Sequence, residues 1–315
     1  MTDIQSAGPL GQPGPLHGEA TSLPPGDGPS TERNASLWAD AWRELIRNPV
    51  FVLSSVAVLA VMSMALAPWL WTSLDPQDCE IELGRQGPGG GHFFGMTKDG
   101  CDMYASVIYG SRPSIAVAVL ATLGVVLVGI LTGILAGYYG RWVDAIISRV
   151  VDIVMGLPFL LGAITLLALW RKREWYAVVA VLIVLGWPLV TRIMRASVLA
   201  TKNMDYVQAA RSLGASDLRI ITRHVLPNAI APVIVVATIA LGSYVAAEAT
   251  LSFLGVGLRP PTVSWGVLIT HGTQWALSPG HAYLLLVPAG LLVVTVLAFI
   301  LMGDALRDAL DPKLR

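Results

Sequence analysis

Six long runs of hydrophobic residues dominate the chain. They cover about residues 50–71, 114–136, 147–170, 176–198, 228–256 and 283–303. A helix needs roughly 20 apolar residues to cross about 30 Å of hydrocarbon, and a helix satisfies its own backbone hydrogen bonds there. The pattern therefore predicts an all-α, polytopic membrane protein with six transmembrane helices.

The N-terminal part differs from the rest of the chain. Residues 1–35 are rich in glycine and proline and hold no apolar run, which predicts a disordered tail. They also lack the adjoining basic and apolar regions of a secretory signal. Residues 36–48 alternate apolar and charged positions at helical spacing, which predicts an amphipathic helix. This helix lies on the membrane surface or packs on the protein itself.

Composition supports a membrane location. Hydrophobic residues make up 54% of the 315 and charged residues only 13%, against about 25% charged residues in soluble domains. The mean hydropathy is +0.64. The formal net charge is zero, so no overall basic field favours nucleic acid as a partner.

The distribution of basic residues predicts the orientation. If the N-terminus is cytoplasmic, the inner flanks hold about twice as many of the 21 Lys and Arg residues as the outer flanks. The turn "RKRE" at 171–174 goes against the trend. The total nevertheless places both termini in the cytoplasm.

A polar segment between the fourth and fifth runs predicts two short helices. Asp205 is placed to cap the first, with Gln208 three residues on, and Gly214 stands at its C-terminus. Ser216 is placed to cap the second, which we expect to end near Pro227. Apolar residues lie among arginines on this cytoplasmic loop, so we expect a docking surface for a soluble partner.

This segment resembles the EAA loop of permease subunits of bacterial ABC importers. That motif is Glu-Ala-Ala, three residues, Gly, nine residues, Ile, any residue, Leu-Pro. The chain keeps the spacing, with Gln in place of Glu and His in place of Ile. The residues expected to form the coupling loop, both those of the motif and those around it, are Asp205, Gln208, Ala209, Ala210, Arg211, Leu213, Gly214, Ser216, Leu218, His224, Leu226 and Pro227.

Further segments are similar to the dipeptide, oligopeptide and nickel branch of these importers, and to its C-type subunit in particular. They are "HFFGMTKDGCDMYASVIYGSRPSI" (92–115), "GYYGRWVDAIISRVVDIVMGLP" (137–158), "EATLSFLGVGLRPPTVSWGVLI" (248–269) and "GDALRDALDP" (303–312). The resemblance implies the type I ABC permease fold over residues 49–315. It implies an extracytoplasmic loop at 72–113 and a cytoplasmic coupling loop at 201–227.

The same resemblance implies partners and a function. They are a second, similar permease, one or two ATPase subunits that bind ATP and Mg, and an extracytoplasmic substrate-binding protein. The expected function is ATP-driven import of di- or oligopeptides across the bacterial cytoplasmic membrane. Nickel or another small solute is the alternative substrate.

Other kinds of chemistry find little support in the sequence. There is no phosphate-binding G-x-x-x-x-G-K-[ST] loop, so ATP is expected on another chain. The histidines lack metal-ligand spacing, and no G-x-S-x-G of a serine hydrolase occurs. We expect no metal and no cofactor in this chain. An ion-coupled secondary transporter is the alternative class, but no internal repeat supports it.

Three features inside the predicted spans leave two interpretations each. A stripe of glycines at 129, 133 and 137 packs against another helix of this chain or against the second permease. Arg149 and Asp152 are spaced to pair on one helical face, as a structural pair or as a relay. Glu248 lines the pathway or serves a structural role.

The only two cysteines, Cys79 and Cys101, both fall in the predicted outer loop. This is the side on which disulfides persist, so a disulfide is expected and two free thiols are the alternative.

Overall fold

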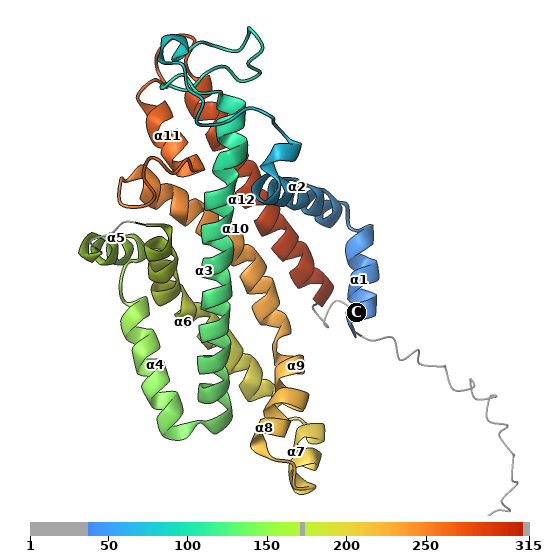
Figure 1. Cartoon of the computed structure of the whole chain (residues 1–315). Helices are drawn as coiled ribbons and strands as arrows, with labels where there is room; N and C mark the ends of the chain where they lie inside the picture. The colour runs from blue at the N-terminus through green and yellow to red at the C-terminus, as the bar shows by residue number, and fades with distance from the viewer. Residues whose placement is uncertain (1–36, 171–173, 311–315) are drawn as a thin grey trace, which may run out of the picture. The chain divides into compact units, whose positions relative to one another are not determined.

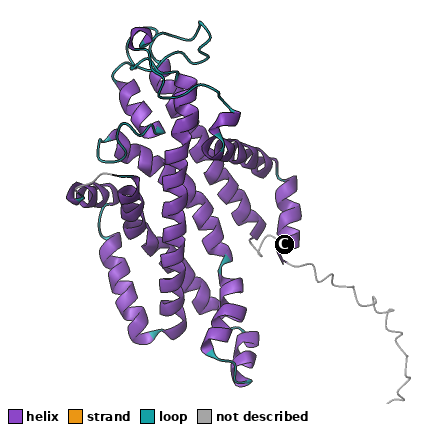
Figure 2. Ribbon diagram, viewed as in Figure 1, coloured by secondary structure: helices purple, strands orange, loops and turns teal. Residues whose placement is uncertain are grey.

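The computed structural model describes residues 37–170 and 174–310, and this part of the chain folds as helices joined by loops, with three isolated bridges in place of strands (Figure 2). Five helices are long and apolar enough to cross a membrane. They are α2 (Pro49–Leu66), α3 (Met103–Tyr139), α6 (Trp175–Thr201), α10 (Ala231–Phe253) and α12 (Tyr283–Leu310). The predicted tail at 1–35 and part of the "RKRE" turn lie outside the described residues.

The third predicted span is not continuous. It consists of α4 (Arg141–Met155) and α5 (Phe159–Leu169), which meet at an angle of 90°. The break falls at Gly156 to Pro158. Proline has no N–H for a helical hydrogen bond and disfavours helix at the residue before it. The span predicted over 147–170 is thus bent at this break, and the pair forms a broken span or a re-entrant loop.

Helix α3 packs closely on α6 along the predicted glycine stripe. A Cβ on Gly133 would lie 2.6 Å from the Cβ of Met194, and Gly129 and Gly137 are similarly close to Val190 and Val198. Only glycine permits this approach of the two helices. The stripe is thus used for packing within the chain.

Helix α3 also joins the two ends of the bundle (Figure 1). The predicted span began near residue 114, but the helix starts at Met103, where the Asp102 side chain accepts a hydrogen bond from the Ala105 N–H at 2.7 Å. Its 37 residues correspond to about 55 Å at about 1.5 Å per residue, which exceeds the hydrocarbon thickness. One end of the bundle carries α11 (Trp265–Thr273) and the other α7 (Asp205–Ser212). We call them the α11 end and the α7 end.

The short helix α1 (Leu37–Arg47) packs on the protein, which was the alternative to a position at the membrane surface. Leu45 is buried against Ala305 and Ala309 of α12. Trp42 and Ile46 are more than half exposed. The helix packs on the protein with one side and presents apolar side chains on another, as an interfacial helix does.

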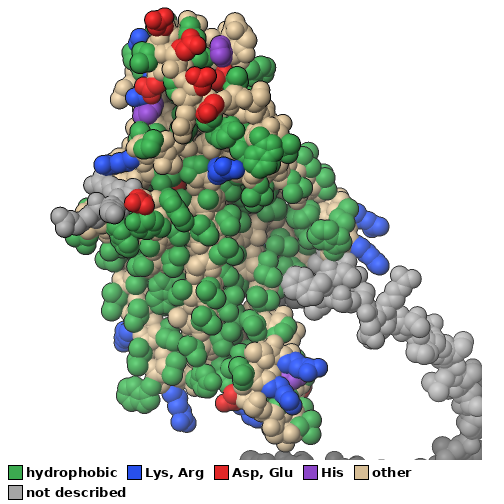
Figure 3. All heavy atoms as spheres, in the orientation of Figure 1, with side chains coloured by type: hydrophobic (Ala, Val, Ile, Leu, Met, Phe, Trp, Pro, Cys, Tyr) green, Lys and Arg blue, Asp and Glu red, His purple; other side chains and the backbone are tan. Residues whose placement is uncertain are grey.

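Side chains are sorted by type along the bundle. Hydrophobic side chains cover the middle, and acidic residues gather at the α11 end (Figure 3). The exposed leucines of α2, α3 and α12 belong to this apolar surface. A water-soluble protein does not expose so continuous an apolar area, whereas a bilayer covers it.

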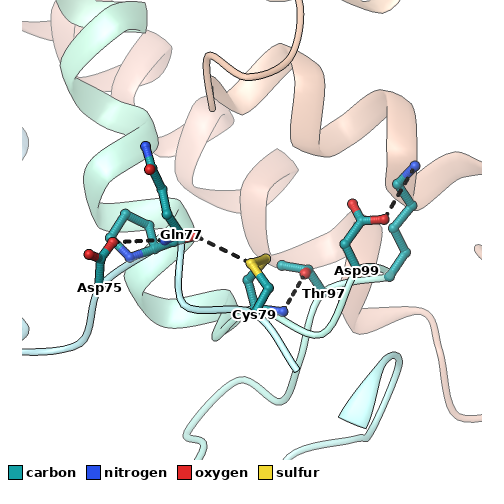
Figure 4. Close-up of a disulfide and its surroundings, with 8 residues drawn as sticks. Asp75, Gln77, Cys79, Thr97 and Asp99 are labelled. Carbon is teal, nitrogen blue, oxygen red and sulfur yellow. Dashed lines mark hydrogen bonds and ion pairs between the residues drawn. A yellow bond between two sulfur atoms is a disulfide. The ribbon is translucent and has the colours of Figure 1, made fainter. Parts of the chain in front are cut away.

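The loop at the α11 end contains the short helices η1 (Pro68–Leu70) and η2 (Ile81–Leu83) and a disulfide between Cys79 and Cys101 (Figure 4). Beside the disulfide, the Cys101 N–H donates to the Thr97 hydroxyl at 3.0 Å. The loop is also attached to α12, because the Tyr283 hydroxyl lies 2.8 Å from the Gln86 carbonyl oxygen. The disulfide closes a loop with a sequence separation of 22.

We expect protein purified without reductant to yield a single disulfide-linked peptide pair containing Cys79 and Cys101. Replacing both cysteines by serine should destabilise the loop by about 3 kcal/mol, since the cross-link restricts the unfolded loop. Non-reducing mass spectrometry tests the bond, and thermal unfolding of the double variant tests its contribution. Two alkylatable thiols in the unreduced protein would contradict the assignment.

Candidate coupling segment and buried polar groups

The segment between α6 and α10 forms a compact unit at the α7 end (Figure 1). It contains α7, α8 (Asp217–Ile220), the π-helical turn η3 (Ile221–Val225) and α9 (Leu226–Ala229). We call residues 204–229 the coupling segment. The N-cap of α7 lies one residue earlier than predicted. Met204 is the N-cap, and Asp205 is the first helical residue. Gln208 makes no capping bond; its side-chain amide donates to the Lys202 carbonyl at 3.1 Å.

Gly214 ends α7 as predicted. Its φ is +82°, in the left-handed region. The Ala215 N–H donates to the Ala210 carbonyl at 3.1 Å, and the Gly214 N–H donates to the Arg211 carbonyl at 3.0 Å. These two bonds form a Schellman motif, which satisfies the last carbonyls of the helix and turns the chain sharply.

The second helix differs from the prediction at both ends. Ser216 is the N-cap of α8 in extended conformation, but its side chain makes no capping hydrogen bond. Pro227 does not close the helix; it lies in the first turn of α9, after η3. Proline lacks the N–H for a regular helical bond, and the wider π turn before it lets the helical path continue.

The coupling segment has two apolar sides. Val207, Ile220 and Val225 are fully buried against the transmembrane helices. Leu213 and Leu218 are 88% and 72% exposed on the opposite side. The other exposed or partly exposed residues of the predicted set are Asp205, Gln208, Ala209, Ala210, Arg211, Gly214, Ser216, His224, Leu226 and Pro227. The buried side therefore anchors the segment to the bundle, and Leu213 and Leu218 remain exposed on its surface.

Tyr138, at the end of α3, was not among the residues predicted for this site. Its hydroxyl donates to Asp217 Oδ1 at 2.6 Å and accepts from Arg211 Nη2 at 3.2 Å. The guanidinium carbon of Arg211 lies 5.7 Å from the centre of the Tyr138 ring. These contacts join residues 73 and 79 positions apart, and no local sequence pattern points to them.

The predicted pair of Arg149 and Asp152 does not form. Asp152 Oδ1 accepts from Arg192 Nη2 of α6 at 2.7 Å, and Arg149 has no ion pair among the described residues. A second bridge joins the same helices, with Arg195 bound through two nitrogens to Asp144. Helix α4 lies beside α6, so a partner across the helix interface is closer than one on the same helix. Both carboxylates therefore fasten α4 to α6.

Glu248 lies on α10 and is completely buried. Ser252 and Ser264 hydroxyls donate to its Oε1 at 2.8 and 3.1 Å, and the Ser114 hydroxyl donates to Oε2 at 2.8 Å. Each of these hydroxyl oxygens accepts a backbone N–H in turn, from Leu258, Val267 and Trp265 respectively.

The network around Glu248 joins three elements, because Ser114 lies on α3 and Ser264 is the N-cap of α11. Trp265 strengthens the joint: its indole N–H donates to the Val107 carbonyl of α3 at 2.9 Å. A buried carboxylate that is fully hydrogen-bonded holds its neighbours in one arrangement. This geometry favours the structural interpretation of Glu248.

An apolar groove follows α6 and α10. It is hollowed in two places with volumes of about 470 and 430 Å³, which share Val236 and Ile239. Ser243 and Tyr244 contribute polar atoms at one part, and Arg307 lies at the other. No cluster of three or more metal-ligating side chains occurs within the described ranges.

Comparison with known proteins gives consistent matches over most of the chain. Residues 129–315 match the family described as binding-protein-dependent transport system inner membrane component. Residues 36–88 match the N-terminal transmembrane domain of oligopeptide transport permease C. The two matches leave residues 89–128 between them, which hold the later part of the α11-end loop and the first part of α3.

Two curated relatives carry the same name. The dipeptide transport system permease protein DppC of Bacillus subtilis is 39% identical over 287 residues, which cover 89% of this chain and 87% of the relative. DppC of Alkalihalophilus pseudofirmus is 34% identical over 297 residues, which cover 94% and 96%. Among solved structures, a chain of the inward-facing methionine ABC transporter MetNI has a TM-score of 0.54 at 20% identity. The match covers 66% of this chain and 97% of that chain, and supports the fold alone.

Proposed function

Because this chain belongs to the family of binding-protein-dependent transport system inner membrane components, a family of membrane permease subunits, we propose that it forms part of the pathway of an ATP-driven importer of di- and oligopeptides. The coupling segment is the observation that carries this proposal. It contains two short helices with defined ends, α7 and α8, and carries exposed leucines at the end of a membrane bundle. An ion-driven carrier has no use for such a docking surface.

The proposed orientation has the α7 end in the cytoplasm and the α11 end outside. The excess of Lys and Arg in the flanks supports it. The disulfide at the α11 end supports it independently, since disulfides persist on the oxidising side of the membrane. Both chain termini are then cytoplasmic.

ATP and Mg are bound by one or two partner ATPase subunits in this proposal. The exposed side of the coupling segment, centred on Leu213 and Leu218, sits in a cleft of the ATPase. Closure of the ATPase then moves the coupling segment and the helices attached to it. This chain contributes no group to hydrolysis.

The groove along α6 and α10 is the proposed wall of the pathway, completed by a second permease. A mostly apolar lining with few polar atoms suits peptides of varied side chains, because it makes few specific demands. The substrate-binding protein on the outer side then provides most of the selectivity. The names of the relatives support peptides as the substrate over nickel.

Uptake by the complete complex in vesicles tests the function. Labelled dipeptide should accumulate with ATP and with the substrate-binding protein present, and not with a non-hydrolysable ATP analogue. A proton ionophore should leave uptake unchanged. Uptake that collapses with the ionophore and ignores ATP would instead assign the chain to ion-coupled carriers.

The orientation is tested by cysteine labelling. Leu277→Cys lies at a fully exposed position at the α11 end, and Asn203→Cys lies at an exposed position at the α7 end, just before the coupling segment. In intact cells an impermeant thiol reagent is expected to label the first variant and to label the second only after lysis. The wild-type chain, whose cysteines are paired, is the unlabelled control. The reverse pattern would overturn the orientation and the placement of the ATPase.

A further inference from the structure

Two helices of the coupling segment, α7 and α8, bind the same residue, Tyr138. Arg211 belongs to α7 and Asp217 to α8, and one phenol hydroxyl bonds both side chains. The residue is only 8% exposed although it lies at the end of a transmembrane helix. Its hydroxyl donates to a carboxylate and accepts from a guanidinium, so both hydrogen bonds are charge-assisted. A change in the angle between α7 and α8 must break one of them.

The C-terminal end of α3 does not move independently of α6. The Lys202 ammonium donates to the Gly137 carbonyl at 2.6 Å and lies 3.4 Å from the Tyr138 carbonyl oxygen. This lysine binds the last free carbonyls of α3, where a positive charge is favourable. The glycine stripe then keeps the two helices in contact from Gly129 to Gly137. A displacement of Tyr138 is therefore a displacement of the α3 and α6 pair.

At its other end, α3 is fastened to α11. Ser114 takes part in the Glu248 network, and the Val107 carbonyl accepts the Trp265 indole N–H. Helix α3 is thus anchored to the coupling segment at one end and to α11 at the other.

We propose that Tyr138 is a positioning residue for transport, which transmits the displacement of the coupling segment to α3 and through it to α11. This inference rests on the proposed function, because it assumes that an ATPase moves the coupling segment. Packing of Val207, Ile220 and Val225 attaches the segment to the bundle, and the Tyr138 hydroxyl fixes the direction in which it is held. A mutation that removes only the Tyr138 hydroxyl should therefore change the direction of the coupling segment and leave its attachment to the bundle intact.

Tyr138→Phe removes the hydroxyl and keeps the ring, so the packing and the stacking of Arg211 on the ring remain. In the reconstituted complex we expect normal association with the ATPase and continued ATP hydrolysis. The amount of dipeptide taken up per ATP hydrolysed should fall about fivefold, within the range of coupling changes caused by residues between two sites. Tyr139→Phe is the matched control, since Tyr139 is half exposed, adjoins Tyr138 and is expected to change nothing.

Asp217→Ala tests the same hydrogen bond from the coupling segment, without a change in the core. It should also lower uptake per ATP, and Tyr138→Phe should add less than its full loss to it, because both changes break the bond between Asp217 and the phenol while only Tyr138→Phe also removes the bond to Arg211. Additive losses in the double variant would overturn the inference, and so would an unchanged ratio in Tyr138→Phe. If the wild-type complex shows no ATP-driven uptake at all, the proposed function fails and this inference fails with it.

Discussion

Gly214→Val is expected to leave the protein in the membrane and to lower ATP-driven uptake about tenfold or more. Gly214 has a φ of +82°, and nothing lies within 4 Å of the place where a Cβ would stand. The penalty is therefore purely conformational, about 1–2 kcal/mol for a residue other than glycine and more for a β-branched one. Because about 1.4 kcal/mol corresponds to a factor of ten, the equilibrium between the present placement of α8 relative to α7 and other placements should shift about tenfold toward the others.

Gly214→Asn is the matched control, because asparagine tolerates the left-handed conformation. Pull-down of the ATPase, substrate-stimulated hydrolysis and vesicle uptake are the measurements, and the asparagine variant should resemble the wild type in all three. Ala209→Glu should act in the same direction as valine, since it places a charge on an exposed position of the docking side. Normal assembly and uptake in Gly214→Val and Ala209→Glu would show that this segment is an ordinary loop.

Glu248→Leu is expected to have the largest effect on folding. The change removes the acceptor of three buried hydroxyl groups, Ser114, Ser252 and Ser264. Each unpaired buried group costs about 1–3 kcal/mol, so the total loss should be about 3 kcal/mol or more. Thermal unfolding of the detergent-purified protein should shift to lower temperature, and less protein should accumulate in the membrane.

Glu248→Gln separates a structural role from a role in the pathway. The amide keeps the shape of the side chain and one oxygen acceptor for Ser252 and Ser264. We expect this variant to fold and to transport within about twofold of the wild type, since most of the hydrogen bonds are retained. A folded Glu248→Gln protein without uptake would show that the carboxylate itself takes part in transport.

The spans and the coupling segment were largely predictable from the sequence because both depend on local pattern. An apolar run of the required length crosses a bilayer whatever surrounds it, so five of the predicted spans appear as single long helices. Gly214 was identifiable in the same way, because a left-handed helix end requires glycine or a near equivalent. Pro158 is a residue type that interrupts helices and so agrees with the break in the third span, but it does not fix the angle of 90°.

The errors concern contacts between elements. Asp152 was expected to pair with Arg149 on its own helix, yet it binds Arg192 on α6. Tyr138 was absent from the predicted site, because its partners are brought to it only when the coupling segment folds back on α3. A spacing of three or four residues identifies neighbours within one helix and gives no information about neighbours across a helix interface.

The sequence by itself determined that this chain is a helical membrane protein and to which family of permeases it belongs. It also indicated which way the helices are expected to cross and where the segment lies that we propose for docking. The hydrophobic periodicity, the basic residues that flank the spans and the spacing of motifs depend only on residues that are close in sequence. They can therefore be identified without the folded structure. The tertiary structure alone decided which groups Glu248 and Tyr138 bind. A single carboxylate joins α3, α10 and α11, and a single phenol joins α3 to α7 and α8. An unpaired polar group is costly once it is buried. The packing of the helices is therefore selected so that each buried donor finds an acceptor, and these contacts do not exist before the chain folds.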